Sequence, residues 1–364
     1  MNIAFFGSSL LSAYWNGAAT YYRGLLGALA RHGHRITFLE PDAFDRQKHR
    51  DIEPPAWARV VVWPATEDGL RGALEHAADA DVVVKASGVG VLDDALLLGM
   101  LDRAPAHALR IFWDVDAPAT LATLAEAGPG DPLRCSLRAL DLVLTYGGGA
   151  PVVERYRALG ARRCVPVYNA LDPEAHHPAP PDPRFAADLV FMGNRLPDRE
   201  ARVEEFFLKA AALTPGRRFL LGGSGWDDKP VPPNVRRLGH VPTHLHNAVN
   251  ASALSVLNVA RDSMAAVGHS PATRVFEAAG AGACLITDDW EGLDAFLRPG
   301  EEVLVARDGA EVARHLEDLT PERARRIGAA ARARILSGHT YARRASQVDA
   351  LLRETLAQRR GVAA

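Results

Sequence analysis

In the first half of the chain, short apolar runs alternate with longer segments that have helical periodicity. The opening run at 3–6 ends in a glycine-serine turn, and residues 17–31 then place apolar side chains on one face of a predicted helix. Runs this apolar are typical of strands that are buried on both faces of a parallel sheet. The alternation therefore predicts an α/β, doubly wound domain. Its further strands are expected at 36–39, 60–63, 82–84, 109–113 and 142–145, and its further helices at 68–78, 92–101, 119–127 and 150–159.

The pattern stops at residues 172–183, which are polar and rich in proline, as in a semi-rigid linker between domains. This segment holds His176 and His177. Adjacent histidines rarely converge on one metal ion without other ligands. We therefore expect both to be ordinary linker residues.

A second alternating series follows the linker. The chain is thus expected to form two Rossmann-like domains, at 1–171 and 184–336, with a terminal helix at 337–364 that packs back on the first domain. Two such domains joined by a hinge leave a central cleft, which the carboxyl ends of strands from both halves face. The strands of the second domain are expected at 189–192, 219–221, 235–238, 253–258, 284–287 and 303–305, and its helices at 199–213, 243–250, 273–279 and 293–297.

Composition and charge exclude several classes of protein. The formal net charge of -2 gives no basic field for nucleic acid, and no stretch approaches the roughly 20 apolar residues that span a bilayer. The arginine-rich stretch at 323–360 is compatible with an amphipathic helix on an anionic membrane, although a solvated helix face fits the near-neutral charge better. Three scattered cysteines argue against disulfides or structural zinc and fit a reducing compartment. We expect a cytoplasmic protein with no integral membrane segment and no nucleic-acid partner.

The segment from Asn258 to the helix predicted at 273–279 carries the strongest chemical signal. A strand ends at Asn258, a polar loop passes through Arg261, and the helix that follows carries Arg274 and Glu277. Free amides at a helix start hold diphosphates, and the helix dipole favours their charge. A carboxylate one turn later accepts both hydrogens of a ribose diol. The alternative is that Glu277 is a surface acid with Arg274 as its i−3 partner, and spacing alone leaves the two interpretations even.

Residues 270–282, Ser-Pro-Ala-Thr-Arg-Val-Phe-Glu-Ala-Ala-Gly-Ala-Gly, resemble the S-x-R-x-F-E-x-x-A-x-G element of the CgeB-like (spore-maturation-protein) glycosyltransferases. The resemblance implies a GT-B fold, a nucleotide sugar donor, no required metal and a ribose-binding role for Glu277. It extends over both halves of the chain, through the segments 112–118, 166–173, 293–302 and 339–344.

One position departs from the wider retaining GT-B families, which carry two glutamates separated by seven residues. The first of these, which contacts the sugar, corresponds to His269 here. The sugar contact and the stereochemistry therefore stay open, and His269 is a candidate catalytic residue.

Further donor-binding candidates follow the first two strands of the second domain. Related enzymes place an arginine and a lysine there to neutralise the leaving diphosphate, which makes Arg195 and Arg199 candidates rather than a surface pair. The glycine-rich loop at 222–225 lets backbone approach the nucleotide base, or is a plain tight turn. The full predicted donor set is Arg195, Arg199, Gly223, Asn258, Arg261, Ser270, Thr273, Arg274 and Glu277.

The first domain is expected to hold the acceptor. Asp114 and Asp116 end a strand with the spacing of a Mg²⁺ or Mn²⁺ motif, but that motif belongs to another glycosyltransferase fold, so we predict no metal. One of them is a candidate general base toward an acceptor hydroxyl, the alternative being a turn or capping aspartate before Pro118. The residues predicted to line the acceptor side are Gly7, Asn16, Gly17, Trp113 and Gly148.

The function expected from these observations is transfer of a sugar from a nucleotide diphosphate donor to a small molecule, glycan or peptide, with no cofactor. A sugar-nucleotide epimerase of the same architecture and a non-catalytic nucleotide-binding module are the alternatives, because a fold alone does not assign function. The residue pattern leaves the sugar, the base and the acceptor open.

Overall fold

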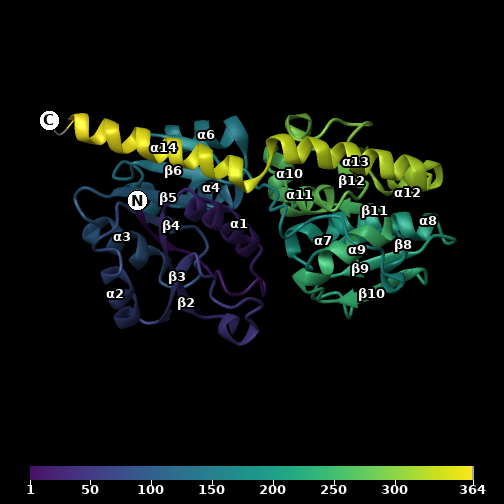
Figure 1. The fold of residues 1–364 in the computed structure, drawn as a ribbon, viewed down its shortest axis with the longest axis horizontal. Coiled ribbons are helices and arrows are strands. Elements are labelled where there is room, and N and C mark those ends of the chain that lie inside the picture. The colour runs from purple at the N-terminus through teal and green to yellow at the C-terminus, as the bar shows by residue number, and fades with distance from the viewer. Residues whose placement is uncertain (363–364) are drawn as a thin grey trace. The chain divides into compact units, whose positions relative to one another are not determined.

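The computed structural model describes residues 1–362. The chain forms two compact units. Unit 1 consists of Met1–Tyr168 together with the C-terminal helix from Tyr341, and unit 2 is Asn169–Thr340. Both units are parallel sheets covered by helices (Figure 1). The predicted fold class is therefore confirmed.

Unit 1 is built on a seven-stranded sheet in the order β3-β2-β1-β4-β5-β6-β7. Every pairing is parallel, and strand order reverses at β1 and β4, which is the switch point of a doubly wound sheet. The short β7 is absent from the sequence prediction. The strands are β1 Asn2–Phe6, β2 Arg35–Asp42, β3 Ala58–Pro64, β4 Val82–Ala86, β5 Leu109–Asp114, β6 Leu142–Thr145 and β7 Cys164–Pro166.

The helices of unit 1 cover both faces of this sheet because their apolar faces pack on the buried strands. Gly24 of α1 is required by α14, since an added Cβ would lie 2.1 Å from the ring of Tyr341. The helices are α1 Ala18–Arg31, α2 Glu67–Glu75, α3 Asp93–Arg103, α4 Ala117–Glu126, α5 Pro132–Ser136, α6 Gly149–Ala158 and α14 Tyr341–Val362, with a 3₁₀ turn at Arg46–His49.

Unit 2 repeats the plan with six parallel strands in the order β10-β9-β8-β11-β12-β13. Strand order reverses at β8 and β11, so their carboxyl ends flank the switch point of this sheet. The strands are β8 Ala187–Met192, β9 Phe219–Gly222, β10 Val235–Gly239, β11 Ala253–Asn258, β12 Leu285–Asp288 and β13 Leu304–Ala306.

The helix predicted at 199–213 is a continuous helical stretch that contains one π turn at Glu204–Leu208. Pro197 at the start of α7 and Pro321 at the start of α13 occupy helix positions that need no backbone donor. The helices are α7 Pro197–Val203, α8 Lys209–Leu213, α9 His246–Ser252, α10 Asp262–Val267, α11 Thr273–Gly280, α12 Gly309–Asp318 and α13 Pro321–Gly338, with 3₁₀ turns at Pro183–Phe185, Thr243–Leu245 and Leu293–Ala295.

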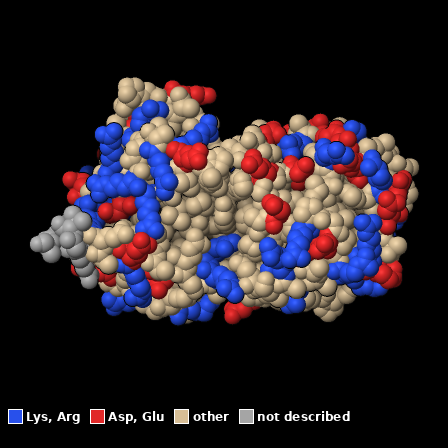
Figure 2. Space-filling view, turned by 90° about the horizontal axis from the view of Figure 1, so that it is seen from above, with Lys and Arg blue, Asp and Glu red and all other residues tan. Residues whose placement is uncertain are grey.

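Two further observations bear on the expected surroundings of the protein. Within residues 1–362, no helix is both long and apolar enough to cross a membrane. Basic and acidic side chains are interspersed over both units on the face shown in Figure 2.

Candidate functional site

Two arginines from different helices lie over the ring of Phe191 at the carboxyl end of β8. The guanidinium carbons of Arg274 and Arg199 are 5.0 Å and 5.7 Å from the ring centroid. A Cβ on Gly193 would lie 3.1 Å from a nitrogen of each guanidinium, so the glycine leaves both of them room against the backbone. Residues 75 positions apart in sequence thus place two positive charges at one strand end.

Neither arginine forms an ion pair with another described side chain. Among the described side chains, neither arginine has a carboxylate oxygen within 4.0 Å, and the buried Nε of Arg199 has no hydrogen-bond partner. Burial, together with the charges of Arg274 and Arg261, lowers the pKa of Arg199 to about 9. Burial also lowers the pKa of Arg274, against the attraction of Glu277. Because arginine stays protonated in proteins, these shifts mean that a bound anion would supply a missing counter-charge.

Arg195 is in a different situation, although the sequence placed it in the same set. Its guanidinium pairs with Glu200 at 2.7 Å and with Asp228 at 2.9 Å. These two carboxylates raise its pKa. Lys229 completes the network at 2.7 Å from Glu200. The charge of Arg195 is therefore already balanced within unit 2.

The loops after β8 and β9 are joined beside the two arginines by a backbone bond, in which the amide of Arg195 donates to the Ser224 carbonyl at 2.9 Å, and by two bonds that involve side chains. The indole N–H of Trp226 donates to the carbonyl of Gly193 at 2.7 Å, and the amide of Ser224 donates to the side-chain oxygen of Asn194 at 3.0 Å. Gly223 has φ +119°, and a Cβ there would lie 2.2 Å from the Gly193 carbonyl oxygen. The predicted glycine is thus required for the two loops to approach each other.

The start of α11 lies in the loop that the sequence singled out. Its N-cap residue, Ala272, makes no side-chain cap, so the positive end of the helix dipole is not neutralised there. The preceding loop is unusual, because His269 takes φ +46°. The hydroxyl of Ser270 donates to the carbonyl of Gly268 at 2.9 Å, and Thr273 opens the helix. Ser270 is therefore used within the loop.

His269 is held by the loop that follows β12. Its backbone N–H donates to the Glu291 carbonyl at 2.6 Å, and its ring lies so close to Gly292 that a Cβ there would meet it at 2.1 Å. Its Nε2 is 3.7 Å from the Glu291 carboxylate. The ring is partly exposed, so His269 stays a candidate for contact with a ligand.

Asn258 and Arg261 are tied to neighbouring elements. Asn258 donates to the Thr287 hydroxyl at 3.0 Å, and Arg261 pairs with Asp198 at 2.6 Å. The sequence analysis missed Asp288, which accepts from the amide of Ala260 and pairs with Arg202 at 2.6 Å. Burial raises the pKa of Asp288, and Arg202 opposes that shift. Arg202 and Asp288 are 86 positions apart, so no local sequence motif predicts this ion pair, which holds the loop at Ala260.

Glu277 lies one turn after Arg274 on α11, and its side chain is 12% exposed. His176 lies in the proline-rich segment that was expected to be a linker, yet its side chain is buried, with Nε2 3.7 Å from the Glu277 carboxylate. In unit 2 the structure thus gathers Arg199 and Arg274 at the end of β8, with Glu277 on the same helix as Arg274.

In unit 1, Asp114 is enclosed rather than presented to an acceptor. Its side chain has no exposed surface and accepts hydrogen bonds from the hydroxyls of Tyr156 and Thr120 and from the amide of Asp116. Burial raises the pKa of Asp114, and these bonds oppose the shift. For Asp114 this enclosure favours the alternative of a structural aspartate over a general base. Asp116, the half-buried N-cap residue of α4, stays a candidate.

The other residues predicted to line the acceptor side differ in burial and in whether their polar groups already have partners. Trp113 is a core residue, whose indole N–H donates to the Tyr21 hydroxyl at 3.1 Å. Asn16 is buried: its amide oxygen accepts from the Ser8 hydroxyl, and its amide nitrogen donates to the carbonyls of Ser9 and Ser12. Gly17 alone of the set is exposed. Gly7 and Gly148 serve packing, because a Cβ would meet the Phe38 ring at 2.5 Å and Val152 at 2.0 Å, respectively.

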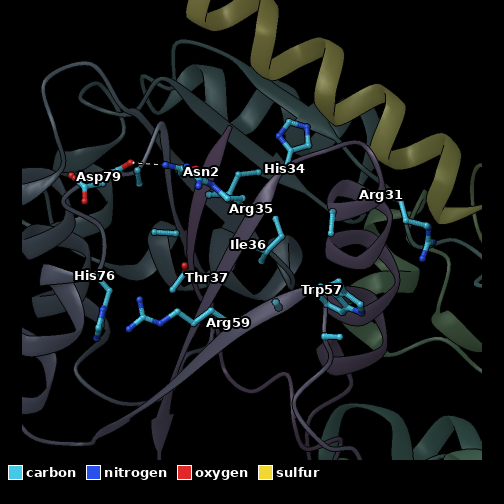
Figure 3. Close-up of a pocket in the computed structure, with 16 residues that line it drawn as sticks. Asn2, Arg31, His34, Arg35, Ile36, Thr37, Trp57, Arg59, His76 and Asp79 are labelled. Carbon is cyan, nitrogen blue, oxygen red and sulfur yellow. Dashed lines mark hydrogen bonds between the residues drawn. The ribbon is translucent and has the colours of Figure 1, made fainter.

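Unit 1 also contains an open cavity of about 770 Å³ (Figure 3). It lies at the amino ends of β1, β2 and β3, where Asn2, Arg35 and Ala58 begin these strands. Asp114 is the last residue of β5, at the opposite, carboxyl edge of the same sheet, and Asp116 follows two residues later. None of the predicted site residues lines this cavity.

Comparison with known proteins gives this geometry a family context. Residues 199–350 match the family described as glycosyl transferase-like. No protein of curated function matches the chain in sequence.

Solved structures similar to the whole chain include sucrose-phosphate synthase from Thermosynechococcus elongatus, with 15% identity and a TM-score of 0.71 over 98% of this chain and 100% of that one. Anabaena HepE in complex with UDP-glucose has 13% identity and a TM-score of 0.67 over 98% and 100%. An alpha-glucosyltransferase in complex with UDP has 10% identity and a TM-score of 0.71 over 96% and 99%. The chain thus has the GT-B fold of these structures, and its residues 199–350 are similar to the glycosyl transferase-like family.

Proposed function

We propose that this protein transfers a sugar from a nucleoside diphosphate donor to an acceptor hydroxyl, and that unit 2 holds the donor. The observation that carries the proposal is the pair of half-buried arginines that lie over the Phe191 ring at the end of β8 without an ion-pair partner among the described side chains, next to the start of α11. A diphosphate supplies the missing negative charge, and its bonds to arginine are charge-assisted.

Uridine diphosphate sugars are the first donors to test. Anabaena HepE was solved with UDP-glucose and the alpha-glucosyltransferase with UDP, and both share the fold of this chain. In our proposal Glu277 accepts the ribose hydroxyls, as the acidic residue of dinucleotide folds does. The motif at 270–282 supports a CgeB-like relationship within the family.

The proposed reaction breaks the bond between the anomeric carbon and the donor phosphate oxygen while the acceptor oxygen bonds to that carbon. Negative charge appears on the departing diphosphate, where the half-buried Arg199 and Arg274 stabilise it. The acceptor hydroxyl gives its proton to a base, for which Asp116 is the candidate. His269 is the candidate for contact with the sugar.

A thermal-shift panel of nucleoside diphosphates and nucleotide sugars tests the proposal first. A ligand at 100 times its dissociation constant stabilises the folded protein by about 2.7 kcal/mol. Release of nucleoside diphosphate is then followed with the best donor, with and without candidate acceptors. We expect release to depend on the acceptor. Conversion of donor alone to an epimer would support the epimerase, and binding without turnover would support the non-catalytic module.

Asp116→Asn is expected to lower turnover by about 10²–10⁴-fold and to leave UDP affinity unchanged, because it removes a general base. Asp114→Asn is expected to spare turnover per folded molecule and to lower the free energy of unfolding by about 1–3 kcal/mol, since its amide cannot accept all three bonds. Turnover and melting temperature are measured on both variants. Full turnover in Asp116→Asn would place the base elsewhere, for instance on a donor phosphate oxygen.

Turnover is expected to change less than about twofold in excess EDTA, because two arginines and a helix start take the role that a metal has elsewhere. The assay follows nucleoside diphosphate release after dialysis against the chelator. Loss of activity that Mn²⁺ restores would contradict this prediction and assign a cation to the diphosphate.

A further inference from the structure

The buried histidine of the proline-rich segment has a feature that its surroundings do not explain. His176 is 2% exposed, and both of its ring nitrogens are buried without a hydrogen-bond partner among the described residues. Buried polar side chains almost always have a hydrogen-bond partner, so an unpaired buried histidine needs an explanation. A core role alone does not give one, because an apolar ring would fill the same space at lower cost.

The chain fixes His176 from both sides. The side chain of Asn247 on α9 donates to the carbonyl of Ala175 at 2.9 Å and accepts from the amide of His177 at 3.2 Å. On the other side, a Cβ on Gly280 of α11 would lie 2.9 Å from the His176 carbonyl oxygen. The segment around His176 is therefore held to α9 by hydrogen bonds and packs closely on α11, and none of these contacts involves the imidazole nitrogens.

The group that the imidazole faces is the carboxylate proposed to bind ribose. Nε2 of His176 lies 3.7 Å from Oε1 of Glu277, just beyond hydrogen-bond distance. The ring of His246 stacks on the other side at 6.0 Å between centroids, with 27° between the planes. Nε2 of His246 lies 3.1 Å from the Val241 carbonyl and donates to it, whereas its Nδ1 is buried without a partner among the described residues. Glu277 is thus the acceptor within reach of His176.

We propose that His176 is a positioning residue that orients the Glu277 carboxylate toward the ribose diol of the donor. A neutral imidazole with its proton on Nε2 donates to one carboxylate oxygen when the side chains move together by less than 1 Å, and the other oxygen is left for the sugar hydroxyls. The inference rests on the proposed donor site. If it holds, His176 contributes to a higher affinity of the protein for a ribonucleotide than for the corresponding 2′-deoxyribonucleotide.

Calorimetric titrations of UDP and 2′-deoxy-UDP into the full-length protein test the assignment. His176→Phe keeps a buried ring and removes the donor, whereas His176→Gln keeps an N–H donor. His177→Phe is the matched control, because that side chain is exposed and, among the described residues, its ring bonds only to the neighbouring Pro178 carbonyl. His176→Asn, which stays polar but is shorter, gives a second loss variant if the Phe variant does not fold.

We expect His176→Phe and His176→Asn to weaken UDP binding about tenfold and 2′-deoxy-UDP binding less than twofold, while His176→Gln and His177→Phe stay within about threefold of wild type. In a Glu277→Ala background, His176→Phe is expected to add no further loss. Equal weakening of both nucleotides, or the same loss without Glu277, would overturn the positioning role. If Glu277→Ala itself leaves UDP affinity unchanged, the donor site fails, and the role of His176 fails with it.

Discussion

Arg199→Gln and Arg274→Gln are each expected to lower turnover by about 10²–10³-fold, because each removes a fixed cation from the departing diphosphate. Arg199→Gln is also expected to leave the melting temperature unchanged or to raise it. The half-buried charge of Arg199 lies near the charges of Arg274 and Arg261 and forms no ion pair with a described carboxylate, so removing it relieves repulsion. Loss of activity with no loss of stability is the signature of a residue whose charge serves a ligand.

Arg195→Gln is the matched control for this prediction. Its charge is balanced by Glu200 and Asp228, so turnover is expected to fall less than about threefold, with a small loss of stability. Measurement of kcat/KM and of melting temperature on the three variants tests whether Arg199 and Arg274, rather than Arg195, bind the diphosphate. A larger loss of turnover in Arg195→Gln than in Arg199→Gln would move the diphosphate to the other side of the loop.

Gly223→Ala is expected to lower the free energy of unfolding by about 2–5 kcal/mol and to weaken UDP binding in the molecules that still fold. The new Cβ would lie 2.2 Å from the Gly193 carbonyl oxygen and 2.9 Å from the Asn194 amide nitrogen. These are backbone atoms of the loop next to the two arginines, so they cannot rotate away. The positive φ of +119° adds strain of its own.

Gly216→Ala provides the comparison, because an added Cβ there meets nothing within 4 Å and its backbone needs no positive φ. It is expected to change the free energy of unfolding by less than about 1 kcal/mol. Denaturant unfolding and UDP titration are carried out on both variants. Equal stability of the two would show that the loops after β8 and β9 separate easily and do not need the glycine.

The sequence was sufficient for the fold because each buried strand of a parallel sheet is a continuous apolar run, as 82–84 is in β4. It failed at β7, whose three residues Cys164–Pro166 are too short to form a pattern. The helix α12 was also missed, although Asp308 caps it. Local patterns thus gave the architecture and missed elements that are short or charged.

The candidate site was predicted less completely, because burial and partners decide which side chains are available. The positions of Arg195 and Arg199 after β8 look equivalent in sequence, and only the distant Asp228 and the neighbouring Glu200 separate them. Asp114 has the strand-end position of a catalytic acid, yet Tyr156 from α6 encloses it. His176 stands in a segment with every sign of a linker. In each case the deciding contact is set by the tertiary fold.

The central claim is that a nucleoside diphosphate binds unit 2 through the end of β8 and through α11. Its most direct test is calorimetric titration of UDP into the wild-type protein and Glu277→Ala, with melting temperatures measured on both. The account predicts that the variant melts like the wild type and binds UDP more weakly by about 1.5–3 kcal/mol, since it loses hydrogen bonds to a charged acceptor. Equal UDP affinity in the two proteins, at equal melting temperature, would contradict it.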